Sequence, residues 1–200
     1  MAILVTGAAG FIGMHAAHAL LARGEEVIGV DSLNDYYDPA LKQARLARLQ
    51  AASGFTFLPI DIADRDAVAG LAARFPTIDR ILHLAAQAGV RYSLENPRSY
   101  IDSNLVGTFN IIQFCKELAV EHLLMASTSS VYGANDNMPY YENLITNTPM
   151  SFYAATKIST EALGHAYSYN WKIPMTFFRF FTVYGTYGRP DMALFKFTKC

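Results

Sequence analysis

Strand-like and helical patterns alternate along this chain from its first residue, which leaves few folds open to it. We expect strands at residues 2–6, 26–30, 55–59, 80–84, 122–127 and 175–180, and helices at residues 11–21, 39–50, 64–74, 97–118 and 151–171. The expected strands are uninterrupted apolar runs. Such strands, separated by helices, are typical of a parallel sheet that is covered on both faces. The sequence therefore predicts an α/β fold built on a doubly wound parallel sheet.

The composition is that of an ordinary globular domain. The chain has 200 residues, 52% of them hydrophobic and 16% charged, which is enough for a sizeable core. The net charge is −1, so no strong positive field favours binding to nucleic acid. No apolar segment reaches the roughly 18 residues that a membrane helix needs, and the two cysteines are too few for a disulfide framework. We expect a cytoplasmic protein that binds neither nucleic acid nor membrane.

A glycine-rich turn joins the first expected strand to the first helix. Gly7 allows a tight turn, Gly10 lets the backbone approach a pyrophosphate, and Gly13 lets the helix pack closely on the sheet. The free N–H groups of the helix N-terminus suit phosphates. Asp31 closes the second strand, where a carboxylate accepts hydrogen bonds from the adenosine ribose and repels a 2′-phosphate. This unit predicts a Rossmann fold that binds NAD. The alternative is that the glycines only serve packing and that Asp31 caps a helix.

Further candidates lie where later strands end, because ligands of open parallel sheets bind along that edge. Asp61-Ile62 follows the third expected strand, and Leu84-Ala85-Ala86 follows the fourth. Asp61 is placed to accept the adenine amino group, although a simple turn residue would look the same. These residues extend the predicted nucleotide site along the sheet.

Tyr153 and Lys157 stand four residues apart and therefore share one face of the expected helix 151–171. An ordinary tyrosine titrates near 10, but a neighbouring ammonium and a positively charged nicotinamide would stabilise the phenolate and lower the tyrosine pKa. The run Ala126-Ser127-Thr128-Ser129-Ser130 ends the fifth expected strand and offers hydroxyls to a sugar oxygen. We predict a proton-transfer site here. The alternatives are a surface pair and a solvated loop.

Together, the glycine turn, the hydroxyl run and Tyr153-x-x-x-Lys157 resemble the extended short-chain dehydrogenase/reductase family of nucleotide-sugar enzymes, also called the NAD-dependent epimerase/dehydratase family. Within it, the stretches at 31–38 (DSLNDYYD), 85–93 (AAQAGVRYS), 179–185 (RFFTVYG) and 188–193 (GRPDMA) resemble UDP-glucuronate 4-epimerases. The similarity spans essentially the whole chain. One departure is Thr186-Tyr187, which stands where these epimerases usually carry Pro-Trp.

The resemblance implies reversible oxidation at sugar C4 by an isomerase that keeps NAD tightly bound. Tyr153 would remove the O4 proton, Lys157 would lower the tyrosine pKa and hold the nicotinamide ribose, and Thr128 would hydrogen-bond O4. The 4-keto sugar would then turn over and be reduced on its other face. Asn104 would brace the nicotinamide side, or it satisfies a buried backbone group. The predicted cofactor-binding residues are Gly7, Gly10, Phe11, Ile12, Gly13, Asp31, Asn34, Asp61, Ile62, Leu84, Ala85, Ala86, Asn104, Tyr153 and Lys157.

Two hydroxyls bear on the choice of reaction. Related decarboxylases carry Glu where Ser130 stands, and 4,6-dehydratases carry Asp-Glu where Ser129-Ser130 stand, so dehydration is disfavoured and decarboxylation less firmly so. Galactose-type 4-epimerases remain the nearest alternative, since their substrate lacks the carboxylate. We predict that Arg91, Ser129, Ser130, Thr182 and Arg189 bind the substrate, with arginine suited to the carboxylate. Arg189 could instead bind the UDP phosphates, and Arg91 could face solvent.

The resemblance also implies how the protein is organised. Residues 1–180 would form an NAD-binding domain, and residues 181–200 would begin an incomplete substrate-binding domain, most of which is missing. An NAD-binding module without turnover is therefore the alternative to an active epimerase. Relatives commonly dimerise through the helices near 97–118 and 151–171, so we expect a homodimer. The histidines lack the spacing of metal ligands, so no metal is expected. Supply of polysaccharide precursors would be the role of such an enzyme.

Overall fold

The computed structural model describes residues 1–198 and confirms the predicted α/β architecture. The strands are β1 (Ala2–Thr6), β2 (Glu26–Asp31), β3 (Phe55–Pro59), β4 (Ile78–His83), β5 (His122–Thr128) and β6 (Met175–Phe180). They form one parallel sheet in the order β3-β2-β1-β4-β5-β6. The chain turns back across the sheet between β3 and β4, so the strand order reverses beside β1. Ligands of this fold bind at that switch point.

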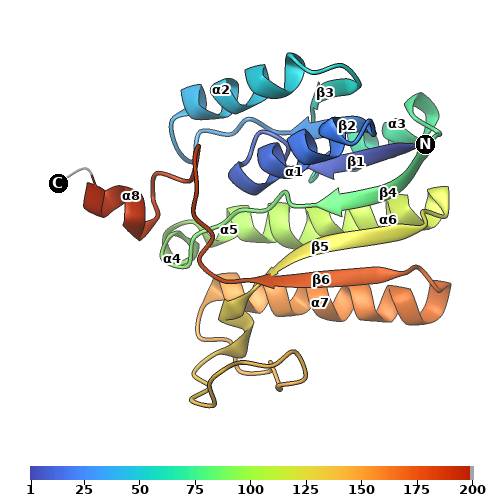
Figure 1. Ribbon diagram of the computed structural model, residues 1–200. Coiled ribbons are helices and arrows are strands. Elements are labelled where there is room, and N and C mark those ends of the chain that lie inside the picture. Colours follow the sequence, from blue (N-terminus) through green and yellow to red (C-terminus); the bar gives the residue numbers. More distant parts are fainter. Residues whose placement is uncertain (199–200) are drawn as a thin grey trace.

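Helices cover both faces of the sheet (Figure 1). On one face lie α1 (Phe11–Ala22) and α2 (Pro39–Gln50), and on the other lie α3 (Arg65–Arg74), α6 (Thr108–Leu118) and α7 (Phe152–Trp171). Each face has its own buried cluster, because alternate residues of a strand point to opposite faces. In β1, Ile3 and Val5 belong to the cluster under α1, whereas Leu4 belongs to the cluster under α6. This double burial explains why the strands are uninterrupted apolar runs.

Side-chain caps define where several helices begin. The carboxylates of Asp38 and Asp64 accept hydrogen bonds from the first turns of α2 and α3, and the Ser151 hydroxyl does the same for α7. The first helix differs, since α1 follows Gly10 and has no side-chain cap. Its first N–H groups are therefore left for another acceptor.

The expected helix 97–118 is present without a gap, but its hydrogen-bonding pattern changes along its length. A short α5 (Pro97–Tyr100) leads into a π-helical turn, η1 (Ile101–Gly107), before α6 begins. Within η1, the Asn104 carboxamide bonds to the backbone of Gln87, and a Cβ on Gly107 would lie 2.6 Å from Ile62. These tertiary contacts coincide with the wider turn, whereas the sequence pattern shows only an ordinary helix. π-Helical turns frequently occur beside functional sites.

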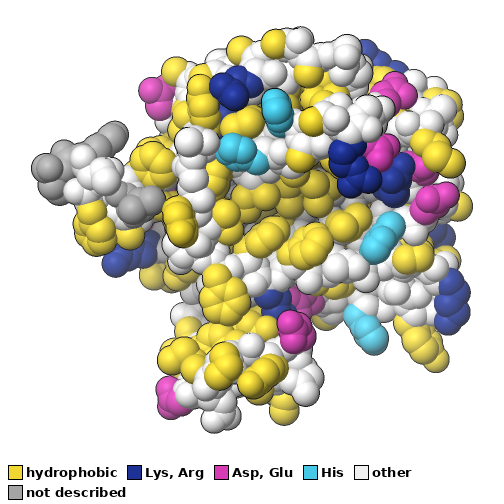
Figure 2. Space-filling model, in the orientation of Figure 1, with side chains coloured by type: hydrophobic (Ala, Val, Ile, Leu, Met, Phe, Trp, Pro, Cys, Tyr) yellow, Lys and Arg dark blue, Asp and Glu magenta, His cyan; other side chains and the backbone are white. Residues whose placement is uncertain are grey.

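The segment after β6 returns across the carboxyl edge of the sheet to α1 and α2 (Figure 1). His15 Nε2 on α1 lies 2.9 Å from the Thr186 carbonyl oxygen. The remaining short elements are α4 (Tyr92–Glu95), η2 (Ser129–Tyr132) and α8 (Ala193–Thr198). Between η2 and α7, an extended loop protrudes from the domain. Figure 2 shows hydrophobic side chains gathered on this loop. Its exposed apolar residues include Met138, Tyr141 and Ile145.

Candidate active site

A cavity of about 920 Å³ runs along the carboxyl edge of the sheet. Of the predicted cofactor-binding residues, Gly7, Gly10, Phe11, Ile12, Gly13, Asp31, Asn34, Asp61, Ile62, Leu84, Ala85, Ala86, Tyr153 and Lys157 line it. Thr128 and the predicted substrate-binding residues Arg91, Ser129, Ser130, Thr182 and Arg189 line the same cavity. The structure therefore brings the two predicted sites together. Which molecule each side chain contacts stays a prediction.

The glycine turn is a tightly bonded backbone cradle. Gly7 has a φ of +71°, and a Cβ there would lie 2.8 Å from the amide nitrogen of Ala85. The Gly7 N–H donates to the Val30 carbonyl at 2.8 Å. A Cβ on Gly13 would lie only 2.0 Å from the Gly7 carbonyl oxygen. Both glycines are needed for close packing, and the uncapped start of α1 lies at the same place.

Asp31 is buried at the end of β2 and is held by several donors. Its Oδ1 accepts from the Leu33 N–H at 2.8 Å, and its Oδ2 accepts from the Ala9 N–H at 3.2 Å. Lys42 Nζ, from α2, lies 3.5 Å from Asp31 Oδ1 and donates to Asn34 Oδ1 at 2.7 Å. Sequence reasoning missed Lys42, since nothing in its spacing from Asp31 shows that α2 returns to the nucleotide site.

The predicted proton-transfer pair lies where α7 faces the end of β5. Lys157 is buried and donates from Nζ to the Ala126 carbonyl at 2.9 Å. Burial lowers the pKa of Lys157 to about 8, although the nearby Glu161 carboxylate acts in the opposite direction. The lysine therefore points at the strand end, in the wall that Tyr153 also lines.

The hydroxyl of Tyr153 is a weaker acid here than in water. Burial raises the pKa of Tyr153, while the nearby Thr128 hydroxyl and the positive charge of Arg189 lower it without reversing the shift. Thr128 and Arg189 therefore both favour the ionised phenol, but burial outweighs them. A further positive charge in the cavity would favour loss of the phenol proton. The expectation that Lys157 lowers this pKa stays a prediction.

Arg189 is already paired on its own segment. Its Nε and Nη2 lie 3.1 and 2.5 Å from the two carboxylate oxygens of Asp191, which also accepts from the Tyr36 hydroxyl at 3.2 Å. An anionic ligand would share Arg189 with this carboxylate. Arg91 is exposed and also lines the cavity, so its side chain can face solvent and still reach a ligand. Sequence reasoning missed Asp191 and Tyr36.

A second ion pair lies behind the hydroxyl run. Glu161 on α7 accepts from Arg179 Nε and Nη2 on β6 at 3.0 and 2.8 Å, and from the Ser127 hydroxyl at 2.5 Å. It therefore ties two strand ends to the helix that carries Tyr153 and Lys157. Its position one turn after Lys157 was visible in the sequence, but its partners were not.

Asn104 lies behind the cavity wall and is not one of its lining residues. Its Oδ1 accepts from the Gln87 N–H at 2.8 Å, and its Nδ2 donates to the Gln87 carbonyl and to Thr156 Oγ1, both at 3.1 Å. The interpretation that Asn104 satisfies a buried backbone group is confirmed. A direct contact with the cofactor stays a prediction.

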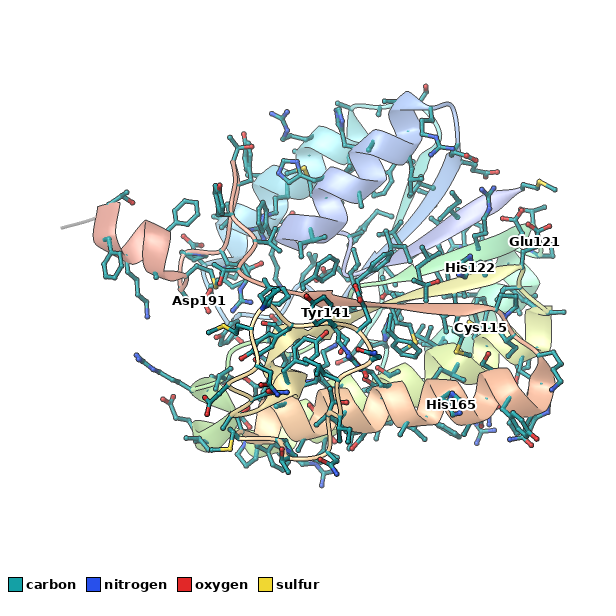
Figure 3. The ribbon with its side chains drawn as sticks, turned by 60° about the horizontal axis from the view of Figure 1, so that its bottom comes forward. Cys115, Glu121, His122, Tyr141, His165 and Asp191 are labelled. Carbon is teal, nitrogen blue, oxygen red and sulfur yellow. The ribbon has the colours of Figure 1, made fainter. Side chains whose placement is uncertain are left out.

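Other chemically capable side chains lie away from the cavity. In Figure 3, Cys115, His122 and His165 stand at the opposite end of the domain from Asp191. Within residues 1–198, no three His, Cys, Asp or Glu side chains gather as metal ligands, and no helix has both the length and the apolar character to cross a membrane. His83 is buried between Thr6 and Thr108, where burial lowers its pKa to about 3.

Comparison with known proteins places the chain in a family. Residues 3–199 match the model of the NAD dependent epimerase/dehydratase family, and the chain belongs to it. A probable UDP-glucuronate 4-epimerase from Rhizobium meliloti (strain 1021) is 52% identical over 197 residues, which cover 98% of this chain and 58% of that protein. UDP-glucuronate 4-epimerase 4 from Arabidopsis thaliana is 48% identical over 98% of this chain and 45% of its own length. The chain thus spans about half to three-fifths of these relatives.

Solved structures show the same likeness. The UDP-glucuronic acid 4-epimerase from Bacillus cereus, in complex with UDP-glucuronic acid and NAD, superposes with a TM-score of 0.90 and 39% identity, covering 98% of this chain and 61% of that one. A dTDP-glucose 4,6-dehydratase from Streptomyces venezuelae superposes with the same TM-score at 30% identity, covering all of this chain and 61% of its own. The backbone alone therefore does not distinguish the reactions, and the side chains of the site must do so.

Proposed function

We propose that this chain is the cofactor-binding part of an NAD-dependent UDP-glucuronate 4-epimerase, which converts UDP-glucuronate to UDP-galacturonate through a 4-keto intermediate. One observation carries the proposal. Arg189, whose guanidinium is suited to a carboxylate or phosphate, lines the same cavity as Tyr153 and the glycine cradle, and its positive charge favours the ionised phenol. An anion site beside a proton acceptor is what the oxidation of an acidic sugar needs.

The residues present fit NAD. The glycine cradle lines the cavity at the uncapped start of α1, whose free N–H groups suit a pyrophosphate. Asp31 ends β2 with a carboxylate that lines the cavity, as the ribose hydroxyls require. When bound, NAD would supply a reversible hydride acceptor. We infer that Asp61 and Ile62 lie along the adenine and that Leu84-Ala85-Ala86 lie along the rest of the dinucleotide.

The chain supplies the proton chemistry and the orientation. Tyr153 would take the proton from O4 as the sugar is oxidised and return it when the sugar is reduced. Thr128 would hydrogen-bond O4, and the Lys157 ammonium would hold the nicotinamide ribose. Because burial raises the pKa of Tyr153, deprotonation would depend on positive charge brought into the cavity. Ser129, together with Arg189, would hold the sugar carboxylate.

The uncharged pair Ser129-Ser130 supports epimerisation over elimination. Both hydroxyls line the cavity, and neither offers the acid and base that a 4,6-dehydratase places there. Decarboxylation and a neutral galactose-type substrate are the alternatives within the family. An NAD-binding module without turnover is the alternative of another class, motivated by the share of the relatives that the chain spans.

We further propose residues 1–180 as the NAD-binding domain and 181–200 as the start of the substrate-binding domain, in a cytoplasmic homodimer. Support for the dimer comes from the helices expected to pair. Val106, Phe109 and Trp171 are apolar but 40–46% exposed on η1, α6 and α7. Phe109 and Trp171 both pack against Tyr167, and adjoining exposed apolar groups of this kind are typical of an interface. A polysaccharide-precursor role would follow from the product.

The test is incubation of the protein with NAD and UDP-glucuronate, with the sugar products identified by NMR. UDP-galacturonate without carbon dioxide is the expected product. A UDP-pentose with carbon dioxide would establish the decarboxylase instead. Bound NAD with no converted sugar would favour the module. A parallel incubation with UDP-glucose decides between the acidic and the neutral substrate.

The Tyr153→Phe variant is the matched control, because it removes one oxygen and keeps the ring. It should still bind NAD, because the glycine cradle and Asp31 are unaltered, and should lose turnover by about a hundredfold or more, the usual contribution of a general base. Turnover at the rate of the unaltered protein would exclude Tyr153 as the base.

A further inference from the structure

Arg45 on α2 is the largest fully buried side chain, with no exposed surface. A buried guanidinium is costly unless its donors are paired. Among residues 1–198 it has no ion pair, and its hydrogen-bond acceptors are a tyrosine hydroxyl and three backbone carbonyls. Such a charge needs a reason beyond the stability of α2, since an apolar residue would fill the position at lower cost.

The acceptors of Arg45 come from distant parts of the chain. Its Nη1 donates to the Ala9 carbonyl of the glycine cradle at 3.2 Å and to the Tyr37 hydroxyl at 2.5 Å. Its Nε and Nη2 donate to the Tyr187 carbonyl at 3.0 and 2.6 Å, and Nη2 also reaches the Gly188 carbonyl at 3.2 Å. The guanidinium thus bonds the nucleotide cradle and the segment after β6 at the same time.

The segment that Arg45 holds adopts a backbone that would not persist alone. Tyr187 has a φ of +57°, in the left-handed region that non-glycine residues disfavour. Tyr187 lies within a tight turn, in which the Gly188 N–H donates to the Gly185 carbonyl at 3.1 Å. Arg189 follows immediately and lines the cavity. Holding the carbonyls of this turn therefore holds the backbone position of Arg189.

We propose that Arg45 is a positioning residue that couples the dinucleotide cradle to the anion-binding side chain of Arg189. The anion-binding role of Arg189 rests on the proposed function, whereas the link that Arg45 makes between the glycine cradle and the 185–188 turn does not. Ligand binding that orders the Ala9 carbonyl strengthens the anchor of the 185–188 turn, and the reverse holds by linkage. A lysine could not substitute fully, because only a guanidinium has the planar fork of donors that reaches both segments.

The first test requires no ligand and measures amide hydrogen exchange in Arg45→Met. Exchange at Gly188, and at Met192, whose N–H donates to the Arg189 carbonyl at 3.3 Å, should accelerate by about tenfold or more, as loss of charge-assisted bonds implies. Exchange in the centre of β1 should change much less. Arg65→Met, which removes an exposed arginine from α3, is the control and should change neither. Unchanged exchange at Gly188 in Arg45→Met would overturn the proposal.

The second test measures the affinity for UDP-glucuronate with and without saturating NAD. In the unaltered protein, NAD should tighten this binding by about fivefold or more, and in Arg45→Met the ratio should approach one. Equal ratios in the two proteins would refute the coupling. If the unaltered protein binds NAD but no UDP-glucuronate, the proposed function fails while the exchange result still decides the role of Arg45. Should Arg45→Met not fold, Arg45→Lys should show the same changes at smaller size.

Discussion

Replacing Gly13 by alanine should damage the nucleotide cradle, whereas the same replacement at Gly70 should stabilise the protein. A Cβ at Gly13 would lie 2.0 Å from the Gly7 carbonyl oxygen and 2.8 Å from its carbon. Gly7 cannot yield freely, because its N–H bonds to Val30 and its carbonyl accepts from the Gly10 N–H. The backbone would have to move by about an ångström, well beyond ordinary van der Waals tolerance.

The magnitude follows from these contacts. Overpacking costs about 1–3 kcal/mol, and the strained hydrogen bonds at Gly7 add about 1 kcal/mol each. The higher helix propensity of alanine offsets about 1 kcal/mol, so Gly13→Ala should lower the free energy of unfolding by about 2–4 kcal/mol. At Gly70, on α3, a Cβ meets nothing within 4 Å, so Gly70→Ala should gain about 0.5–1 kcal/mol.

Thermal melting and NAD titration measure both variants side by side. Gly13→Ala should melt about 5–15 °C lower, at about 2–4 °C per kcal/mol, and should bind NAD at least about tenfold more weakly. Gly70→Ala should melt slightly higher with unchanged NAD affinity. The reasoning is refuted if Gly13→Ala matches the unaltered protein in both measurements, or if Gly70→Ala is equally damaged.

Three further predictions concern charged and titrating groups. Glu161→Gln should leave the half-buried Arg179 without its carboxylate partner. The free energy of unfolding, measured by urea denaturation, should fall by about 2–3 kcal/mol, somewhat below the range for fully buried pairs. The same change should move the alkaline loss of activity to lower pH, because the Glu161 charge raises the pKa of Lys157, which stands at about 8. In the folded protein the pKa of His83 is lowered to about 3, so the unfolded chain binds a proton there far more readily. The free energy of unfolding should therefore rise with pH between about 3 and 6.5. His83→Gln should flatten that rise, as measured by urea midpoints at pH 5 and 7.5. Asp31→Asn should weaken NAD binding and raise the ratio of NADP to NAD affinity, since the repelling carboxylate is gone.

Each of these has a contrary outcome. An alkaline limb that stays in place in Glu161→Gln would mean that Lys157 does not govern it. An equally steep dependence of stability on pH in His83→Gln would assign the acid limb to other groups. An unchanged NADP to NAD ratio in Asp31→Asn would place cofactor discrimination elsewhere in the cavity.

Much of the site was predictable because its signals are local. The strands are apolar runs of a few residues, the glycine turn lies within one short segment, and Tyr153 and Lys157 are related by one helical turn. The carboxyl ends of parallel strands must meet at one edge of the sheet. Local patterns and that rule together bring the predicted residues to one cavity.

The residues that sequence reasoning missed have partners far along the chain. Nothing near Arg45 shows that Tyr187 will lie against it, and nothing near Glu161 shows that it will pair with Arg179. The π-helical turn at Asn104 likewise accompanies its bonds to Gln87, although the local pattern predicts an ordinary helix. By itself, the sequence determined the order and type of the elements and the chemistry at the strand ends. Only the tertiary structure decided which buried charges hold that chemistry in place, because a buried polar group is stable only where the fold supplies its partners.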